Sequence, residues 1–158
     1  LMLFHAVSCT YFETAIVSRG FEKSINDYHT KDHVDTPLSN PYENEDIRHL
    51  FYHKNWVDTV QWHLEDIIRD PEINAVEALK IKRRIDKSNQ VRTDMVEFID
   101  SYFLDLYKSV SVKSDAKINT ESPAWAYDRL SILALKIWAP SSNSPFFILL
   151  AYTTFAMS

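Results

Sequence analysis

The sequence is poor in the residues that several classes of protein need. Its 158 residues include a single glycine, Gly20, whereas phosphate-binding loops need several glycines whose backbone can approach a ligand closely. Walker A and Rossmann nucleotide sites are therefore excluded. The single cysteine, Cys9, cannot form an intramolecular disulfide, which excludes a cysteine-based zinc cluster and a disulfide-stapled secreted scaffold. We therefore expect a cytoplasmic protein.

The chain also lacks long hydrophobic runs and an excess of positive charge. Its most apolar stretch, PFFILLAYTTFAM, holds 13 residues, fewer than the ~20 that a helix needs to cross a bilayer. Residues 1–20 lack the basic region of a signal peptide. The net charge of -5 arises from 17 basic and 22 acidic residues that are interspersed, which argues against nucleic-acid binding. We expect small molecules or proteins as partners, with no nucleic acid and no membrane, and the oligomeric state stays open.

The charged residues that are present gather in the middle of the chain. Outside residues 21–138 only Glu13 and Arg19 are charged. We therefore expect one helical domain over residues 21–138. The segments 1–20 and 139–158 are expected to be atypical, altered by a frameshift or an unusual gene call, and less well ordered than the middle.

Periodicity and capping residues predict helices throughout that central region. A first helix is expected to end near Tyr28, and a second to span residues 46–69, before Asp70-Pro71. Asn74 followed by Glu77 is typical of a helix start, and no glycine or proline then interrupts the chain until Pro123. We predict one long helix over residues 74–107 and another from residue 123. The fold class is thus all-α, an up-down bundle of four or more helices.

Each long helix carries a stripe that we expect to face the core. In the second helix the stripe contains Leu50, Val57, Leu64 and Ile68. In the third it contains Ile81, Ile85, Ser88, Arg92, Met95, Ile99, Tyr102 and Leu106. The helix from residue 123 is apolar on nearly every side after Leu130, so we expect it to be central.

A line of polar and aromatic side chains follows the other face of the second helix. Steps of four, three, four and three residues join its members, Asn55, Thr59, Trp62, Asp66 and Arg69. One interpretation is structural, with Trp62 as packing and the polar groups paired between helices. The other is a pocket in which Trp62 stacks on a ring and charged neighbours hold a polar or phosphorylated ligand.

Arg92 is unusual because it interrupts an apolar stripe. A buried guanidinium without a partner costs several kcal/mol, so it needs a carboxylate or a wet cavity. We expect Arg92 to be mostly buried and paired with Asp66 or Asp128 on another helix. Arg92 and Asp128 therefore join the candidate ligand-binding residues, although buried arginine–carboxylate pairs also fix the register of plain bundles, and the pattern slightly favours that structural role.

Metal binding has a weaker signal. His29, Asp32 and His33 lie within one turn, and His49 and His53 have the i, i+4 spacing of a helical zinc pair. Ordinary exposed or capping histidines would give the same patterns. Glu97 and Asp100 form an acidic pair that we interpret as a solvated face. No Ser-His-Asp or Cys-His constellation is supported, so no catalytic residue or cofactor is assigned.

Four stretches carry a resemblance to a known family, and they read DYHTKDHVDTP, YHKNWVDTVQWHLEDIIRDP, IKRRIDKSNQVRTDMVEFIDSYF and INTESPAWAYDRLSILALKI. In order and content they resemble the bacterial domain-of-unknown-function family 4254 over about residues 21–138. The resemblance implies a mostly helical bacterial protein and supplies no catalytic residues. Two hypotheses follow: a helical domain that binds a small polar or phosphorylated ligand at the polar line, or a non-catalytic interaction or scaffold protein.

Overall fold

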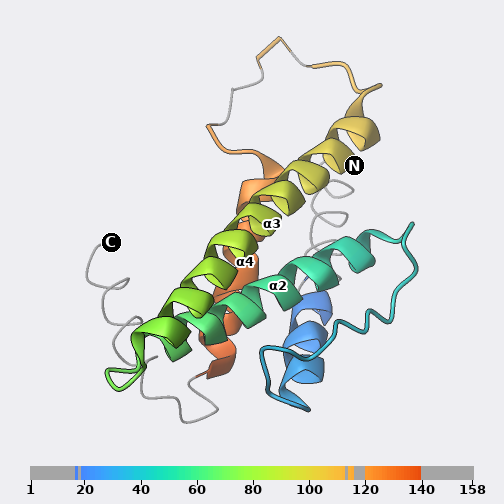
Figure 1. Cartoon of the computed structure of the whole chain (residues 1–158). Coiled ribbons are helices and arrows are strands. Elements are labelled where there is room, and N and C mark those ends of the chain that lie inside the picture. Colours follow the sequence, from blue (N-terminus) through green and yellow to red (C-terminus); the bar gives the residue numbers. More distant parts are fainter. Residues whose placement is uncertain (1–16, 18, 113, 116–119, 140–158) are drawn as a thin grey trace.

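The structure is a computed structural model that describes residues 17, 19–112, 114–115 and 120–139 (Figure 1). The terminal segments expected to be atypical, 1–20 and 139–158, lie outside these residues except for Val17, Arg19, Gly20 and Ala139. In the described part, an N-terminal helix ends at residue 29 and is followed by α2 (Ile47–Ile68), α3 (Ala75–Tyr107) and α4 (Pro123–Trp138). None of the described residues forms a strand, so the predicted all-α bundle is confirmed.

The three labelled helices begin where short polar side chains can cap them. The side chain of Asp46 accepts a hydrogen bond from the backbone N–H of Arg48 (2.8 Å), and that of Asn74 accepts one from the N–H of Glu77 (2.9 Å). Ser122 does the same for α4, with Pro123 in the first turn. Such caps satisfy N–H groups that have no partner within the helix. Because they depend on neighbours within three positions, the predicted starts agree with the observed ones to within one residue.

The helices α2, α3 and α4 pack against one another, each contacting the other two. In Figure 1 a short loop joins the end of α2 to the start of α3. Helix α4 runs behind α3, and the N-terminal helix lies against α2. No helix in the described part of the chain is long and apolar enough to cross a membrane.

The apolar core is divided into groups along α2. Near the start of α2, Phe51 packs with Val96 and Ile99 of α3 and Ala124 of α4. Near its end, Leu64 packs with the α3 residues Ile81 and Ile85. A third group packs the N-terminal helix against α2 and consists of Tyr28, Tyr52 and Trp56. Between the first two groups the buried side chains of α2, apart from Tyr52 and Trp56, are polar, and these positions hold the candidate site.

The prediction for the buried face of α2 is only partly correct, and that for α4 is wrong. Leu64 of the α2 stripe is buried against α3, whereas Leu50, Val57 and Ile68 are only partly buried, and Asn55 and Thr59 on the other face are fully buried. The reason is that α2 also contacts α3 and α4 through that polar face. The fourth helix is not central, because it packs through its narrow face of Ala124, Ser131 and Leu135. Among its exposed apolar side chains are Trp125, Leu130, Leu133 and Ile137.

The stripe predicted for α3 is correct over most of its length. Ile81, Ile85, Met95 and Ile99 are buried, and Ser88 and Arg92 are partly buried. Tyr102 and Leu106 are exposed, which corrects the prediction for the last turns of the helix.

The stability of two neighbouring variants of α3 tests this helix phase. Ile99 has an exposed fraction of 0%, whereas that of Phe98 is 61%. We expect Ile99→Ala to lower the free energy of unfolding by about 2–5 kcal/mol, because it opens a cavity in the core. Phe98→Ala should change it by about 0.5 kcal/mol or less. Urea denaturation of both variants measures the difference, and equal losses would contradict the phase.

Candidate functional site

A layer of charged side chains crosses the bundle between α2, α3 and α4. Lys54 Nζ of α2 lies 2.6 Å from Asp58 Oδ2 and 2.7 Å from Asp128 Oδ1 of α4. Arg92 Nε of α3 lies 2.6 Å from Asp58 Oδ1, and its Nη2 lies 3.7 Å from Asp128 Oδ1. Two cations are thus paired with two carboxylates across three helices. We call these four residues the ion-pair layer.

Asp58 is the centre of this layer because donors from three helices meet at its carboxylate. Ser131 Oγ of α4 donates to Asp58 Oδ2 at 2.6 Å, beside the bond from Lys54, and Arg92 of α3 donates to the other oxygen. Asn55 Nδ2 donates in turn to Ser131 Oγ at 3.0 Å. Both carboxylate oxygens therefore have charge-assisted partners, as a buried carboxylate requires.

The layer is balanced in charge, and the balance matters because it is buried. The Lys54 and Asp58 side chains have exposed fractions of 1% and 0%. Removing one member of such a set leaves an uncompensated charge in the core, whereas apolar residues of similar volume in place of all four would stabilise a bundle comparably. Stability alone does not require charges at these positions.

The expectation for Arg92 is partly correct. Its side chain is 24% exposed, and it contacts Asp128 as expected. Its main partner, however, is Asp58, which the sequence reasoning missed, and the expectation of Asp66 is wrong. One signal could have identified Asp58: it lies three residues after Asn55 and four before Trp62, on the same face of the helix.

The predicted polar line divides into a buried half and a half-exposed half. Asn55 and Thr59 are fully buried, and Thr59 Oγ1 donates to the backbone oxygen of Asn55. Trp62 and Asp66 are partly buried. Arg69, at the exposed end, has Nη1 3.5 Å from Asp66 Oδ1. Burial raises the pKa of Asp66, although the Arg69 guanidinium opposes the shift. The line is therefore not one continuous surface.

A cavity of about 280 Å³ opens where the ion-pair layer meets the half-exposed part of the line. Its lining comes from three helices and consists of Asp58, Gln61, Trp62, Glu65, Arg69, Arg92 and Ile132. Gln61 Nε2 donates to Asn89 Oδ1 at 2.7 Å, while its buried Oε1 has no hydrogen-bond partner among the described residues. Of the candidate residues, the cavity unites Trp62, Arg69 and Arg92.

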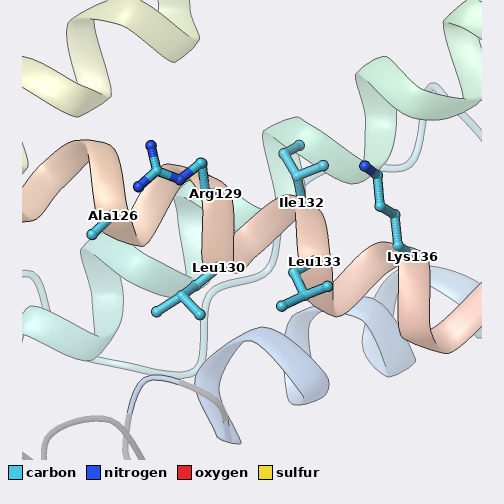
Figure 2. A pocket seen from close by; sticks show the side chains of 6 residues that line it. All are labelled: Ala126, Arg129, Leu130, Ile132, Leu133 and Lys136. Atoms are coloured by element: carbon cyan, nitrogen blue, oxygen red, sulfur yellow. The ribbon is translucent and has the colours of Figure 1, made fainter. Parts of the chain in front are cut away.

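A larger hollow, of about 590 Å³, has a different character (Figure 2). It is lined by one helix, α4, through Ala126, Arg129, Leu130, Ile132, Leu133 and Lys136. In Figure 2 Leu130 and Leu133 project to one side of the helix, and Arg129, Ile132 and Lys136 to the other. Arg129 forms an ion pair with Glu121. No charged groups of opposite sign converge within this lining, so we favour the smaller cavity as the candidate site.

The histidine patterns are rearranged in the structure. Two of the three predicted metal residues, His29 and Asp32, lie together, but the third member of their cluster is His63 of α2. His33, which the sequence favoured, lies beside Asp35 instead. Burial lowers the pKa of His63, which favours a neutral imidazole. The sequence separation of 34 residues between His29 and His63 gave no local signal for their contact.

The other residues that the sequence suggested for metal binding lie apart from this cluster, and their contacts are those of ordinary helix and loop residues. His49 Nδ1 lies 2.8 Å from the backbone oxygen of Tyr42, and its ring centroid lies 6.4 Å from that of His53. Glu97 is exposed, as expected. Asp100 is partly buried and accepts hydrogen bonds from Ser122 Oγ (2.9 Å) and the N–H of Ala124 (3.3 Å). Its interpretation as a solvated face is therefore wrong, because Asp100 caps the start of α4.

These features define a small all-α domain with a charged, partly buried cavity between its helices. The chain belongs to the family described as Protein of unknown function (DUF4254), which matches residues 48–144, more than half of the chain. The match confirms the family that the sequence motifs resemble, over a range that starts and ends later than residues 21–138. It includes the whole ion-pair layer and His63, but not His29 or Asp32. No curated protein and no solved structure matches the chain.

The ion-pair layer predicts unequal effects for two lysines with the same i, i+4 partner spacing. Lys54→Met leaves two carboxylates facing one cation in the core, so we expect the free energy of unfolding to fall by about 3–5 kcal/mol. Lys82 pairs with Asp86 and is 54% exposed, so Lys82→Met should cost about 1 kcal/mol or less. Denaturation curves at low and high salt measure both, and a stable Lys54→Met variant would contradict a coupled layer.

Proposed function

We propose that this protein is a ligand-binding helical domain and that a small polar or phosphorylated molecule binds in the cavity beside Arg92. The single observation that carries the proposal is the junction of a buried ion-pair layer with a cavity lined from three helices. Small-molecule sites commonly lie between the helices of bundles and combine apolar walls with a few convergent polar groups.

Arg92 is suited to anion recognition because its position is fixed from behind. Asp58 holds Arg92 Nε at 2.6 Å and is itself held by Lys54 and Ser131. The guanidinium is therefore oriented before a ligand arrives, which reduces the entropy lost on binding. Its planar fork matches the oxygens of a carboxylate or phosphate. Arg69 adds a second cation to the same cavity.

The other lining residues favour a ligand with a ring and hydroxyl groups. Trp62 offers an aromatic surface on which a sugar or a base can stack. Gln61 also lines the cavity, and because its side-chain oxygen has no partner among the described residues, a rotation that exposes this oxygen would let it accept a hydrogen bond from a ligand hydroxyl. The volume of about 280 Å³ lies just below the ~300–1,000 Å³ of typical small-molecule sites. A sugar phosphate or part of a nucleotide fits this size.

The second candidate is a non-catalytic interaction or scaffold protein in which the polar seam only fixes the bundle. It is favoured by the deep part of the seam, where Asn55, Asp58 and Ser131 are fully buried and bonded to one another. Buried polar groups in bundles can select one register of the helices without binding anything. The two candidates differ in whether occupation of the cavity stabilises the fold.

A thermal-shift screen of nucleotides, sugar nucleotides and sugar phosphates, each with and without magnesium, manganese or zinc, distinguishes the two. A ligand at a hundredfold excess over its dissociation constant should add about 2.7 kcal/mol of stability. For a domain of this size, that raises the melting temperature by about 5–10 °C.

Three variants then locate the binding site. Trp62→Ala and Arg69→Gln alter the cavity wall and should abolish the shift. Trp125→Ala removes an exposed tryptophan of α4 that does not line the cavity, so it should retain the shift and serves as the matched control for Trp62→Ala. A shift that survives Trp62→Ala and Arg69→Gln together would place the ligand elsewhere, and silence across the screen would favour the scaffold.

A further inference from the structure

We propose that His29, Asp32 and His63 form a site for a divalent transition metal of the zinc type. The proposal is independent of the cavity beside Arg92. The three side chains come from the end of the N-terminal helix, the loop that follows it, and α2. His29 Nε2 lies 3.1 Å from His63 Nε2, and each of these nitrogens lies 3.8 Å from Asp32 Oδ1.

These distances match the bond lengths of a metal centre. In the plane of the three atoms, the point equidistant from them lies about 2.1 Å from each, by the geometry of a triangle with sides of 3.1, 3.8 and 3.8 Å, and zinc bonds to nitrogen and oxygen are ~2.0–2.2 Å long. One ion can therefore reach all three ligand atoms with little movement of the side chains.

The hydrogen bonding of His29 directs the correct nitrogen to that point. His29 Nδ1 lies 2.6 Å from the backbone oxygen of Ile25, and a carbonyl oxygen can only accept. Nδ1 therefore carries the proton, which leaves the Nε2 of a neutral imidazole with a lone pair directed to His63 and Asp32. A histidine that binds a metal through one nitrogen commonly donates its other N–H to such a carbonyl.

Both imidazole rings are held in place by aromatic neighbours. Trp138 stacks on His29 with ring centroids 3.7 Å apart, and Tyr28 stacks on His63 at 5.1 Å. Asp32 has a φ of 49°, in the left-handed region that an aspartate tolerates better than most residues. This backbone conformation, three residues after the end of the N-terminal helix, orients the carboxylate beside the two histidines.

The ligand types favour zinc over the hard cations. Imidazole nitrogen suits zinc and its neighbours, whereas magnesium and calcium prefer oxygen ligands throughout. The side chain of Asp32 is 60% exposed, so solvent can reach the metal. Three protein ligands with a fourth position open to water is the composition of catalytic zinc sites rather than of closed structural ones.

Zinc titration of the EDTA-treated full chain by calorimetry, with Mg²⁺ as the comparison, tests the site. We expect one Zn²⁺ per chain and no heat from Mg²⁺. His63→Gln and Asp32→Asn should each weaken Zn²⁺ binding by more than about a hundredfold, because removing a direct ligand costs at least as much as losing the group that orients it. Asparagine also tolerates the left-handed backbone at residue 32.

His33→Gln is the matched control. His33 lies next to Asp32 in the same loop and its side chain is 66% exposed, so this variant should keep the full affinity. Circular dichroism of each variant establishes that it is folded. The proposal is overturned if the folded chain does not bind Zn²⁺, in which case His29 and His63 share only a hydrogen bond. It is equally overturned if affinity is unchanged in a His63→Gln/Asp32→Asn double variant, or if His33→Gln alone removes it.

Discussion

The bond between Asp58 and its donors from three helices is the constraint on which the rest of the bundle depends. A carboxylate with no exposed surface needs partners for both oxygens, and here they come from Lys54, Arg92 and Ser131. Lys54 is on the same helix as Asp58, whereas Arg92 and Ser131 require α3 and α4 to bring their donor atoms within about 3 Å of the acid. Apolar contacts on either side of the layer are compatible with several arrangements of the helices. The hydrogen bonds are directional, so they are compatible with few of these arrangements.

The cavity is a consequence of how that layer ends. Towards α2 and α4 it is closed by Asn55 and Ser131, while on the side of α3 Arg92 reaches the surface. A long, flexible cation is thus fixed at the boundary between core and solvent by a fully buried acid. The same arrangement accounts for the two candidate functions, because the closed end fixes the helices and the open end presents an oriented charge.

Local features of the sequence predicted the helices well. For contacts between helices, they predicted the type of partner but not which residue supplies it. The caps at Asn74 and Ser122 depend on residues within one turn, so they can be identified from the chain alone. An arginine in an apolar stripe must find an acid, but Asp58 and Asp66 differ by about 80° around the helix axis. Which of them faces Arg92 is decided by the crossing of α2 and α3, and no pattern within one helix specifies that crossing.

Apolar composition was an equally incomplete guide. The helix α4 is apolar on most sides, yet its contact with α2 and α3 is made by the small residues Ala124 and Ser131 together with Leu135. Small side chains let two helices approach closely, and burial follows that approach rather than hydrophobicity. The role of His63 beside His29 was missed for a related reason. The two residues are 34 positions apart, and only the packing of the N-terminal helix against α2 brings them together.

Ser131 also fixes the register of α4 relative to α2. Its hydroxyl accepts from Asn55 and donates to Asp58, so its position along α4 is tied to one point on α2. If α4 slid by about one turn, ~5.4 Å, the carboxylate would meet Leu135 or Tyr127 instead of a hydroxyl. Neither a leucine nor a bulky ring can replace that small donor. The hydrogen bonds of the layer therefore form in only one register of α4 relative to α2.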